Sequence, residues 1–184
     1  KRLLGFSSVA RAGYIVVGLV AGTPKGMAAA AFYALAYVIM NMLCFWIVSR
    51  VAVDGRNLEL KDLNGLYKRS PALAFSLAVG AFALVGLPPT IGFMGKLFLL
   101  SAAWNHGYNW LVIGMVLNSA IAIYYYLSMV RHAYTEEEAP AELPDTSTFS
   151  TAGAMVLAGL ALLLGVLPAF VFDVAVKAGE AMMR

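Results

Sequence analysis

The chain has 184 residues, of which 61% are hydrophobic and only 12% are charged, and its mean hydropathy is +0.79. Soluble domains contain about 25% charged residues, so this composition excludes an ordinary soluble protein and predicts an integral membrane protein surrounded by a lipid bilayer. The net charge of +3 does not indicate nucleic-acid binding, because the basic residues lie between apolar stretches rather than on one soluble face. The single cysteine, Cys44, excludes an intrachain disulfide and a cysteine metal cluster.

No nucleotide-binding or metal-binding motif accompanies this composition. The sequence has no G-x-G-x-x-G, no Walker loop and no paired-histidine spacing, so we predict no metal or cofactor site in this chain. The chain begins with Lys1 and Arg2 rather than methionine. We therefore expect it to be a piece of a longer protein.

Long uncharged runs predict an all-α, polytopic bundle of transmembrane helices that forms a single domain over residues 1–184. A membrane span needs about 20 apolar residues, and the runs are long enough for five spans. In chain order, the predicted spans cover residues 3–21, 27–49, 71–104, 108–130 and 149–167.

The third of these segments is too long for one straight helix. At 1.5 Å per residue it would extend roughly 51 Å, against a hydrocarbon core of about 30 Å. Gly86, Pro88, Pro89 and Gly92 crowd into seven residues, and proline removes a backbone donor and clashes with the preceding turn. We predict a helix that is discontinuous at Pro88-Pro89, and a packed or hydrated interior site at the break.

Two longer loops set the predicted topology. Residues 50–70 alternate charges with leucines and predict an amphipathic loop with a short interfacial helix, whereas residues 131–148 form an acidic, proline-containing loop. The face with the start of the chain and these loops carries eight Lys and Arg residues, and the opposite face carries three. The positive-inside rule then predicts a cytoplasmic start and, after five spans, an external C-terminus.

Lys96 is the only formally charged residue between Pro71 and Val130. An ammonium at the centre of a spanning helix costs about 2.5 to 3.5 kcal/mol, so we expect it to serve a purpose. Desolvated lysines can release a proton near neutral pH, which favours a proton-carrying site. Two alternatives stay open: a structural lysine that caps the broken helix, and a lysine that snorkels to the interface.

Further polar residues on the predicted spans are candidates for a water-filled polar axis. Tyr33, Tyr37 and Asn41 share one helical face by their spacing. Helix packing and interhelical hydrogen bonding is the alternative for the whole set. The other candidates are Arg11, Tyr14, Thr90, Asn118, Ser119 and Tyr124, although Tyr124 to Tyr126 also fit an aromatic belt at the cytoplasmic interface.

Four stretches together resemble one family: "KRLLGFSSVARAGY" (1–14), "LKDLNGLYKRSP" (60–71), "GLPPTIGFMGKLFLLSAAW" (86–104) and "NSAIAIYYYL" (118–127). They are similar to the C-terminal portion of the subunit N family of proton-pumping NADH:quinone oxidoreductase, respiratory complex I. The third stretch alone is shared with related antiporter-like subunits.

The resemblance implies that the chain supplies the last five of fourteen helices, with Lys96 as the channel lysine of a discontinuous helix. It implies a bacterial inner-membrane location with a periplasmic C-terminus, which agrees with the charge count. Partners would be the N-terminal half of the same subunit and other membrane subunits of the complex. By resemblance, NADH, FMN, iron–sulfur clusters and quinone would belong to partner subunits, whose electron transfer drives the pumping.

Arg11 departs from the family pattern, in which histidine or glutamine is expected at this position. Its guanidinium is a poor proton relay, and it either snorkels to the cytoplasmic face or acts electrostatically inside the bundle. Two alternatives to the predicted function remain. One is a subunit of a cation/proton antiporter or membrane-bound hydrogenase, and the other is a non-conducting membrane scaffold.

Overall fold

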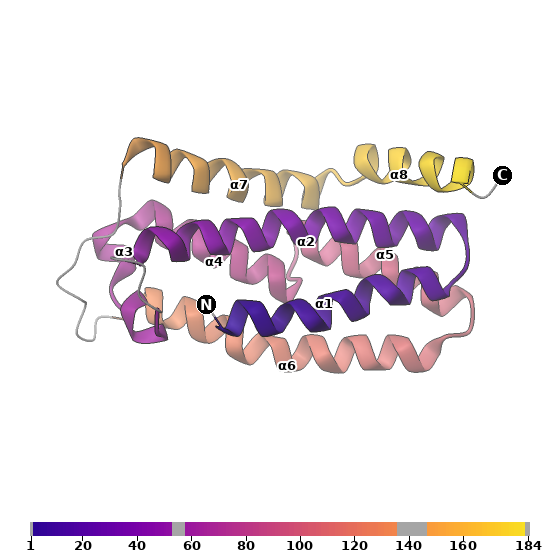
Figure 1. The fold of residues 1–184 in the computed structure, drawn as a ribbon, viewed down its shortest axis with the longest axis horizontal. Coiled ribbons are helices and arrows are strands. Elements are labelled where there is room, and N and C mark those ends of the chain that lie inside the picture. Colours follow the sequence, from indigo (N-terminus) through magenta and orange to yellow (C-terminus); the bar gives the residue numbers. More distant parts are fainter. Residues whose placement is uncertain (1, 53–57, 136–146, 183–184) are drawn as a thin grey trace.

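The computed structural model describes residues 2–52, 58–135 and 147–182. Within these ranges the regular elements are helices, and most of them run along one long axis (Figure 1). In chain order they are α1 (Arg2–Val20), α2 (Pro24–Val51), the 3-10 helix η2 (Leu60–Leu63), α3 (Leu66–Arg69), α4 (Pro71–Val85), α5 (Ile91–Asn105), α6 (Asn109–Ala133), α7 (Thr148–Val166) and α8 (Ala169–Met182).

Four of the described helices are long and apolar enough to cross a membrane: Leu3–Val20, Pro24–Val51, Asn109–Ala133 and Thr148–Val166. This confirms the prediction of a polytopic helical membrane protein. The second helix begins earlier than the sequence pattern suggested, at Pro24 rather than Met27. The reason is local, because Thr23 Oγ1 accepts a hydrogen bond from Gly26 N and proline fits the first helical position.

The predicted third segment forms two helices, α4 and α5, which follow each other along the bundle (Figure 1). Helix α4 ends at Val85 and is capped by Gly86, whose φ of 88° lies in the left-handed region that favours glycine. The chain turns through residues 87–90, and Thr90 Oγ1 donates a hydrogen bond of 2.6 Å to the Leu87 carbonyl oxygen before α5 begins. Each helix has 15 residues, which is short for a bilayer on its own.

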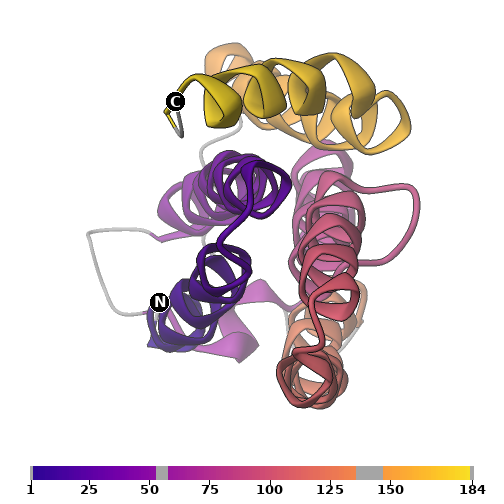
Figure 2. The ribbon, with the colours of Figure 1, turned by 90° about the vertical axis from the view of Figure 1, so that its right-hand side faces the viewer.

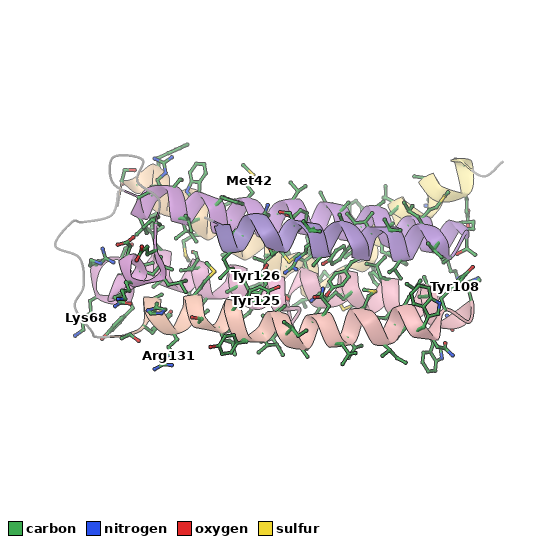
Figure 3. All side chains as sticks on the ribbon, turned by 60° about the horizontal axis from the view of Figure 1, so that its bottom comes forward. Met42, Lys68, Tyr108, Tyr125, Tyr126 and Arg131 are labelled. Carbon is green, nitrogen blue, oxygen red and sulfur yellow. The ribbon has the colours of Figure 1, made fainter. Side chains whose placement is uncertain are left out.

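The two predicted loops are partly described. In the stretch 50–70, η2 and α3 take the place of the single interfacial helix that we expected, and residues 53–57 lie outside the described part. Residues 131–133 continue α6, which shortens the predicted acidic loop, and residues 136–146 lie outside the described part. Figure 3 places Lys68 and Arg131 at one end of the bundle and Tyr108 at the other.

Helix α2 is the central helix of the bundle and contacts α1, α4, α5, α7 and α8. Viewed along the bundle, α7 and α8 cover one side of it (Figure 2). The opposite side holds α1 and α6, which both contact the α4–α5 pair. The join between α4 and α5 therefore lies between α7 on one side and α1 and α6 on the other.

Candidate functional site

Lys96 lies on α5 close to the join with α4, and its side chain is only 7% exposed. Its ammonium Nζ donates to the Val85 carbonyl oxygen at 2.5 Å and to Ser119 Oγ of α6 at 3.1 Å. The Leu84 carbonyl oxygen lies 3.4 Å from the same Nζ. The ammonium thus sits among three oxygen atoms, and the geometry excludes the snorkelling alternative.

The two carbonyl groups are available because α4 ends there. The amides of Gly86 and Leu87 both bond to the Phe82 carbonyl oxygen, and the last carbonyl groups of a helix have no intrahelical donor. These groups also form the negative end of the helix dipole, which attracts a cation. The helix break therefore creates the oxygen-rich end that receives Lys96.

Glycines let the parts of the break approach closely. A Cβ at Gly86 would lie 3.0 Å from Lys96 Cδ and 3.2 Å from its Nζ. The lack of a side chain at Gly86 therefore leaves the space that the Lys96 side chain occupies. A Cβ at Gly92 would overlap the Ala83 carbonyl oxygen, so this glycine brings the start of α5 against the end of α4. Pro88 and Pro89 lie at the exposed turn between the helices.

Hydrogen bonds continue from Lys96 toward α1. Ser119 Oγ lies 3.2 Å from Tyr14 Oη, which also receives a 2.7 Å hydrogen bond from Asn118 Nδ2. Tyr14 Oη lies 3.4 Å from the Met115 carbonyl oxygen, and the Lys96 Nζ lies 5.5 Å from the centre of the Tyr14 ring. Three residues of the predicted polar axis are thereby connected to the lysine.

Arg11 lies on α1 and has no exposed surface. Its Nη2 donates to the Leu84 carbonyl oxygen at 2.7 Å and to Tyr126 Oη at 2.9 Å. Of the two alternatives for Arg11, snorkelling to the cytoplasmic face is excluded, because the guanidinium is enclosed by α1, α4 and α6. Its Nε and Nη1 have no hydrogen-bond partner among the described residues.

The remaining candidates of the polar axis differ in their surroundings. Tyr37 Oη donates to Ser8 Oγ at 2.6 Å, whereas Tyr33 Oη and Asn41 Oδ1 are buried without a partner in the described part of the chain. Thr90 is buried and bonds within the turn of the break. These residues line the interior but do not extend the hydrogen-bonded path from Lys96.

Tyr124 does not join the polar axis to which the sequence assigned it. It is 84% exposed in this chain and points away from the site, whereas Tyr126, two positions later, is fully buried and holds Arg11. Figure 3 shows Tyr125 and Tyr126 between the two ends of the bundle, so Tyr126 does not belong to an aromatic belt at the interface. The spacing contained the signal, since Tyr126 lies seven residues after Ser119 and shares its helical face.

A cavity of about 300 Å³ between α5 and α6 reaches the lysine. Lys96 and Ser119 are its polar lining, and most of the other walls are apolar, including Leu97, Leu100 and Val116. Among the described residues there is no group of three His, Cys, Asp or Glu side chains placed to hold a metal ion. The chemistry that the site offers is that of a buried amine and its hydroxyl partners.

Comparisons with known proteins show which protein family the chain resembles. Residues 1–122 match the family model described as "NADH:quinone oxidoreductase/Mrp antiporter, TM". The chain is 63% identical over 179 residues to "NADH-quinone oxidoreductase subunit N 2" of Solidesulfovibrio magneticus; the match covers 97% of this chain and 38% of that protein. The chain therefore spans about two-fifths of the length of this relative.

Solved structures share the fold. A chain of respiratory complex I from Thermus thermophilus is similar with a TM-score of 0.82 and 33% identity, over 94% of this chain and 39% of that one. A chain of the Mrp complex from Dietzia sp. matches with a TM-score of 0.85 and 23% identity, over 96% of this chain and 41% of that one, which shows the fold alone. The chain belongs to the NADH:quinone oxidoreductase/Mrp antiporter transmembrane family.

Proposed function

We propose that this chain is the C-terminal, proton-conducting part of a membrane subunit of a proton-translocating NADH:quinone oxidoreductase. The observation that carries the proposal is the Lys96 ammonium, which is enclosed at the end of α4 and hydrogen-bonded to Ser119. A lysine can release and regain a proton, and a hydroxyl group can both accept and donate one. The kinship to a subunit of an NADH-quinone oxidoreductase supports the choice of enzyme.

The membrane arrangement is part of the proposal. Helices α4 and α5 together form one discontinuous span, which with α1, α2, α6 and α7 makes five. Their combined 30 helical residues extend about 45 Å at 1.5 Å per residue, enough for one crossing with a turn inside it. The start of the chain is on the cytoplasmic side of a bacterial inner membrane and the C-terminus on the periplasmic side, since the basic residues gather on the side of the two longer loops.

The proposed function also requires partner subunits. The N-terminal half of the same subunit and the other membrane subunits surround this bundle, while NADH, FMN, iron–sulfur clusters and quinone act in partner subunits. The length of the relatives supports a larger subunit, because this chain covers only 38% of the first of them. Electron transfer elsewhere changes the charges near Lys96, and the lysine responds by exchanging its proton.

In the proposed step, the protonated Lys96 holds the Val85 carbonyl group and Ser119. A shift of nearby charge favours the neutral amine, and the proton passes to Ser119 while the hydroxyl proton of Ser119 moves on to Tyr14. Tyr14 then gives its own hydroxyl proton to water, so that Ser119 and Tyr14 each gain one proton and lose one, and Lys96 takes up a new proton from water before the next cycle. The cap on α4 and the proton transfer are two functions of one side chain, so capping and conduction do not exclude each other.

The test compares protons translocated per NADH oxidised in vesicles that contain the full, assembled complex. We expect Lys96→Met to lower the ratio at least fivefold, and Lys96→Arg to lower it as well, because arginine keeps its proton. Lys177→Met on the exposed side of α8 is the matched control, and it should pump normally. Normal ratios in both Lys96 variants at equal assembly would overturn the proposal and leave a capping lysine.

A cation/proton antiporter subunit is the second candidate, favoured by the family model, whose description includes Mrp antiporters. Replacing sodium by potassium or choline in the vesicle assay separates the two. Transport that requires sodium supports the antiporter, and unchanged proton translocation supports the first candidate. A non-conducting scaffold would show itself by a Lys96→Met complex that pumps normally but accumulates in smaller amounts.

A further inference from the structure

Arg11 and Lys96 meet at one backbone atom. The Leu84 carbonyl oxygen accepts from Arg11 Nη2 at 2.7 Å and lies 3.4 Å from Lys96 Nζ. Arg11 comes from α1 and Lys96 from α5, so side chains from two helices converge on the end of a third. The sequence gives no local sign of this meeting, because the acceptor is a main-chain atom of a leucine.

The two cations have no carboxylate of their own in the surrounding helices. The sequences of α1, α2, α4, α5, α6 and α7 contain neither Asp nor Glu. Buried charges require hydrogen-bond partners, so the carbonyl groups at the end of α4 and the Tyr126 hydroxyl stabilise the positive charges here. The ring of Tyr126 adds to this, with its centre 5.2 Å from Arg11 Cζ.

The two side chains differ in how they behave when a proton leaves. Arginine keeps all five N–H donors, whereas lysine changes from three donors to two and weakens its hold on an acceptor. A carbonyl group that is left without a donor inside a membrane costs free energy. With Arg11 in place, the Leu84 carbonyl oxygen keeps a short hydrogen bond in either state of Lys96.

We propose that Arg11 is a positioning residue that holds the C-terminal end of α4 while Lys96 exchanges its proton. The inference rests on the proposed function of Lys96. It assigns to Arg11 the role of a permanent hydrogen-bond donor outside the proton path. This role explains why a group that never deprotonates lies beside one that does. Tyr126 then acts through Arg11, by accepting from the same Nη2 and fixing its direction.

The experiment uses the full complex in vesicles and three variants. Arg11→Met keeps an unbranched side chain but shortens it and removes its donors and charge, and we expect at least a threefold drop in protons per NADH oxidised. Arg11→Lys retains most of the reach, a donor and the positive charge, and we expect it to keep at least half of the wild-type ratio. Rescue by lysine separates a donor role from simple space filling, which methionine would satisfy equally well.

Tyr126→Phe provides a milder variant in case Arg11→Met does not assemble. It keeps the ring and removes one acceptor of the guanidinium, and we expect about a twofold drop. A wild-type ratio in either Arg11→Met or Tyr126→Phe overturns the inference, as does an Arg11→Lys variant as weak as Arg11→Met. Lys96→Met serves as reference: if it alone loses pumping, only the inference fails, whereas normal pumping in Lys96→Met overturns the proposed function as well.

Discussion

The join between α4 and α5 has two unlike neighbours. On the side of α1 and α6 the contacts are polar: Arg11 donates to the Leu84 carbonyl oxygen and to Tyr126, and Ser119 Oγ lies 3.2 Å from Tyr14 Oη. On the side of α7 they are made by small residues, and Gly165 lies so close to the turn that a Cβ there would overlap the Pro89 carbonyl oxygen. One side offers hydroxyl and guanidinium groups, and the other packs closely against the backbone of the break.

The apolar side continues along the bundle. Buried residues recur on one face of α7 at Ser150, Ala154, Ala158, Ala161 and Gly165, which allows close approach to α4 and α2. Beyond α7, Phe172 of α8 stacks on Phe98 with ring centres 3.9 Å apart. The difference teaches that the polar groups near Lys96 come from one side of the break, while the small residues that pack against its backbone come from the other.

The largest effect is expected from enlarging the apolar side. Gly165→Leu places a side chain where the backbone of Pro89 and Thr90 lies, and overpacking of a core costs about 1 to 3 kcal/mol or more. We expect most of the assembled complex to be lost, as measured by native gel electrophoresis of solubilised membranes. Gly159→Leu on the same helix is the control, since a Cβ there meets nothing within 4 Å. Equal assembly of the two variants would contradict the close packing of α7 on the break.

Gly86→Ala acts where the two sides meet. The added methyl group would crowd the Lys96 side chain, and the φ of 88° adds roughly 1 to 2 kcal/mol of backbone strain. Gly107→Ala imposes a similar strain, at a φ of 79°, with nothing within 4 Å of the new Cβ. We expect both variants to assemble less well, but only Gly86→Ala to lower protons per NADH, by about threefold to tenfold. An equal number of protons per NADH in both variants would mean that Gly86 is needed for the backbone turn and not for the position of Lys96.

A smaller effect is expected from Ser119→Ala, which removes the hydroxyl acceptor of Lys96 without changing the fold. A hydrogen bond to a charged group contributes about 1.5 to 3 kcal/mol, and the two carbonyl groups remain. We expect a twofold to fivefold drop in protons per NADH at normal assembly, and recovery in Ser119→Thr. Ser101→Ala, at an exposed serine of α5, should have no effect. A wild-type ratio in Ser119→Ala would remove the serine from the path.

The sequence predicted much of the helical arrangement, because long uncharged runs and clustered prolines act locally. The end of one helix at Val85 and the start of the next at Ile91 followed from the same local signals, and the proton-carrying role of Lys96 stays a prediction. The acceptors of Lys96 could not be predicted, since two of them are backbone carbonyl oxygens of Leu84 and Val85 and carry no residue signature. The depth of Arg11 also depended on how α1 packs against α4 and α6, which local patterns do not contain.

The tyrosines on α6 differ in burial according to their position on the helix. Met115, Ala122, Tyr126 and Met129 form one buried stripe at helical spacing, and Tyr124 lies off that stripe. The "YYY" stretch therefore has one tyrosine that faces the interior and one that faces out. Composition groups these residues together, while the helical period separates them.

The join of α4 and α5 lies part-way along the bundle, between the end with Lys68 and Arg131 and the end with Tyr108 (Figures 1 and 3). In the proposed function, a proton bound to Lys96 would therefore have crossed only a fraction of the transmembrane voltage. Moving one charge through 100 mV costs about 2.3 kcal/mol, so the voltage itself biases how often the lysine is occupied. A strongly polarised membrane would then slow the proposed proton transfer at Lys96, so the proposed rate of proton translocation should depend on the membrane potential at this residue.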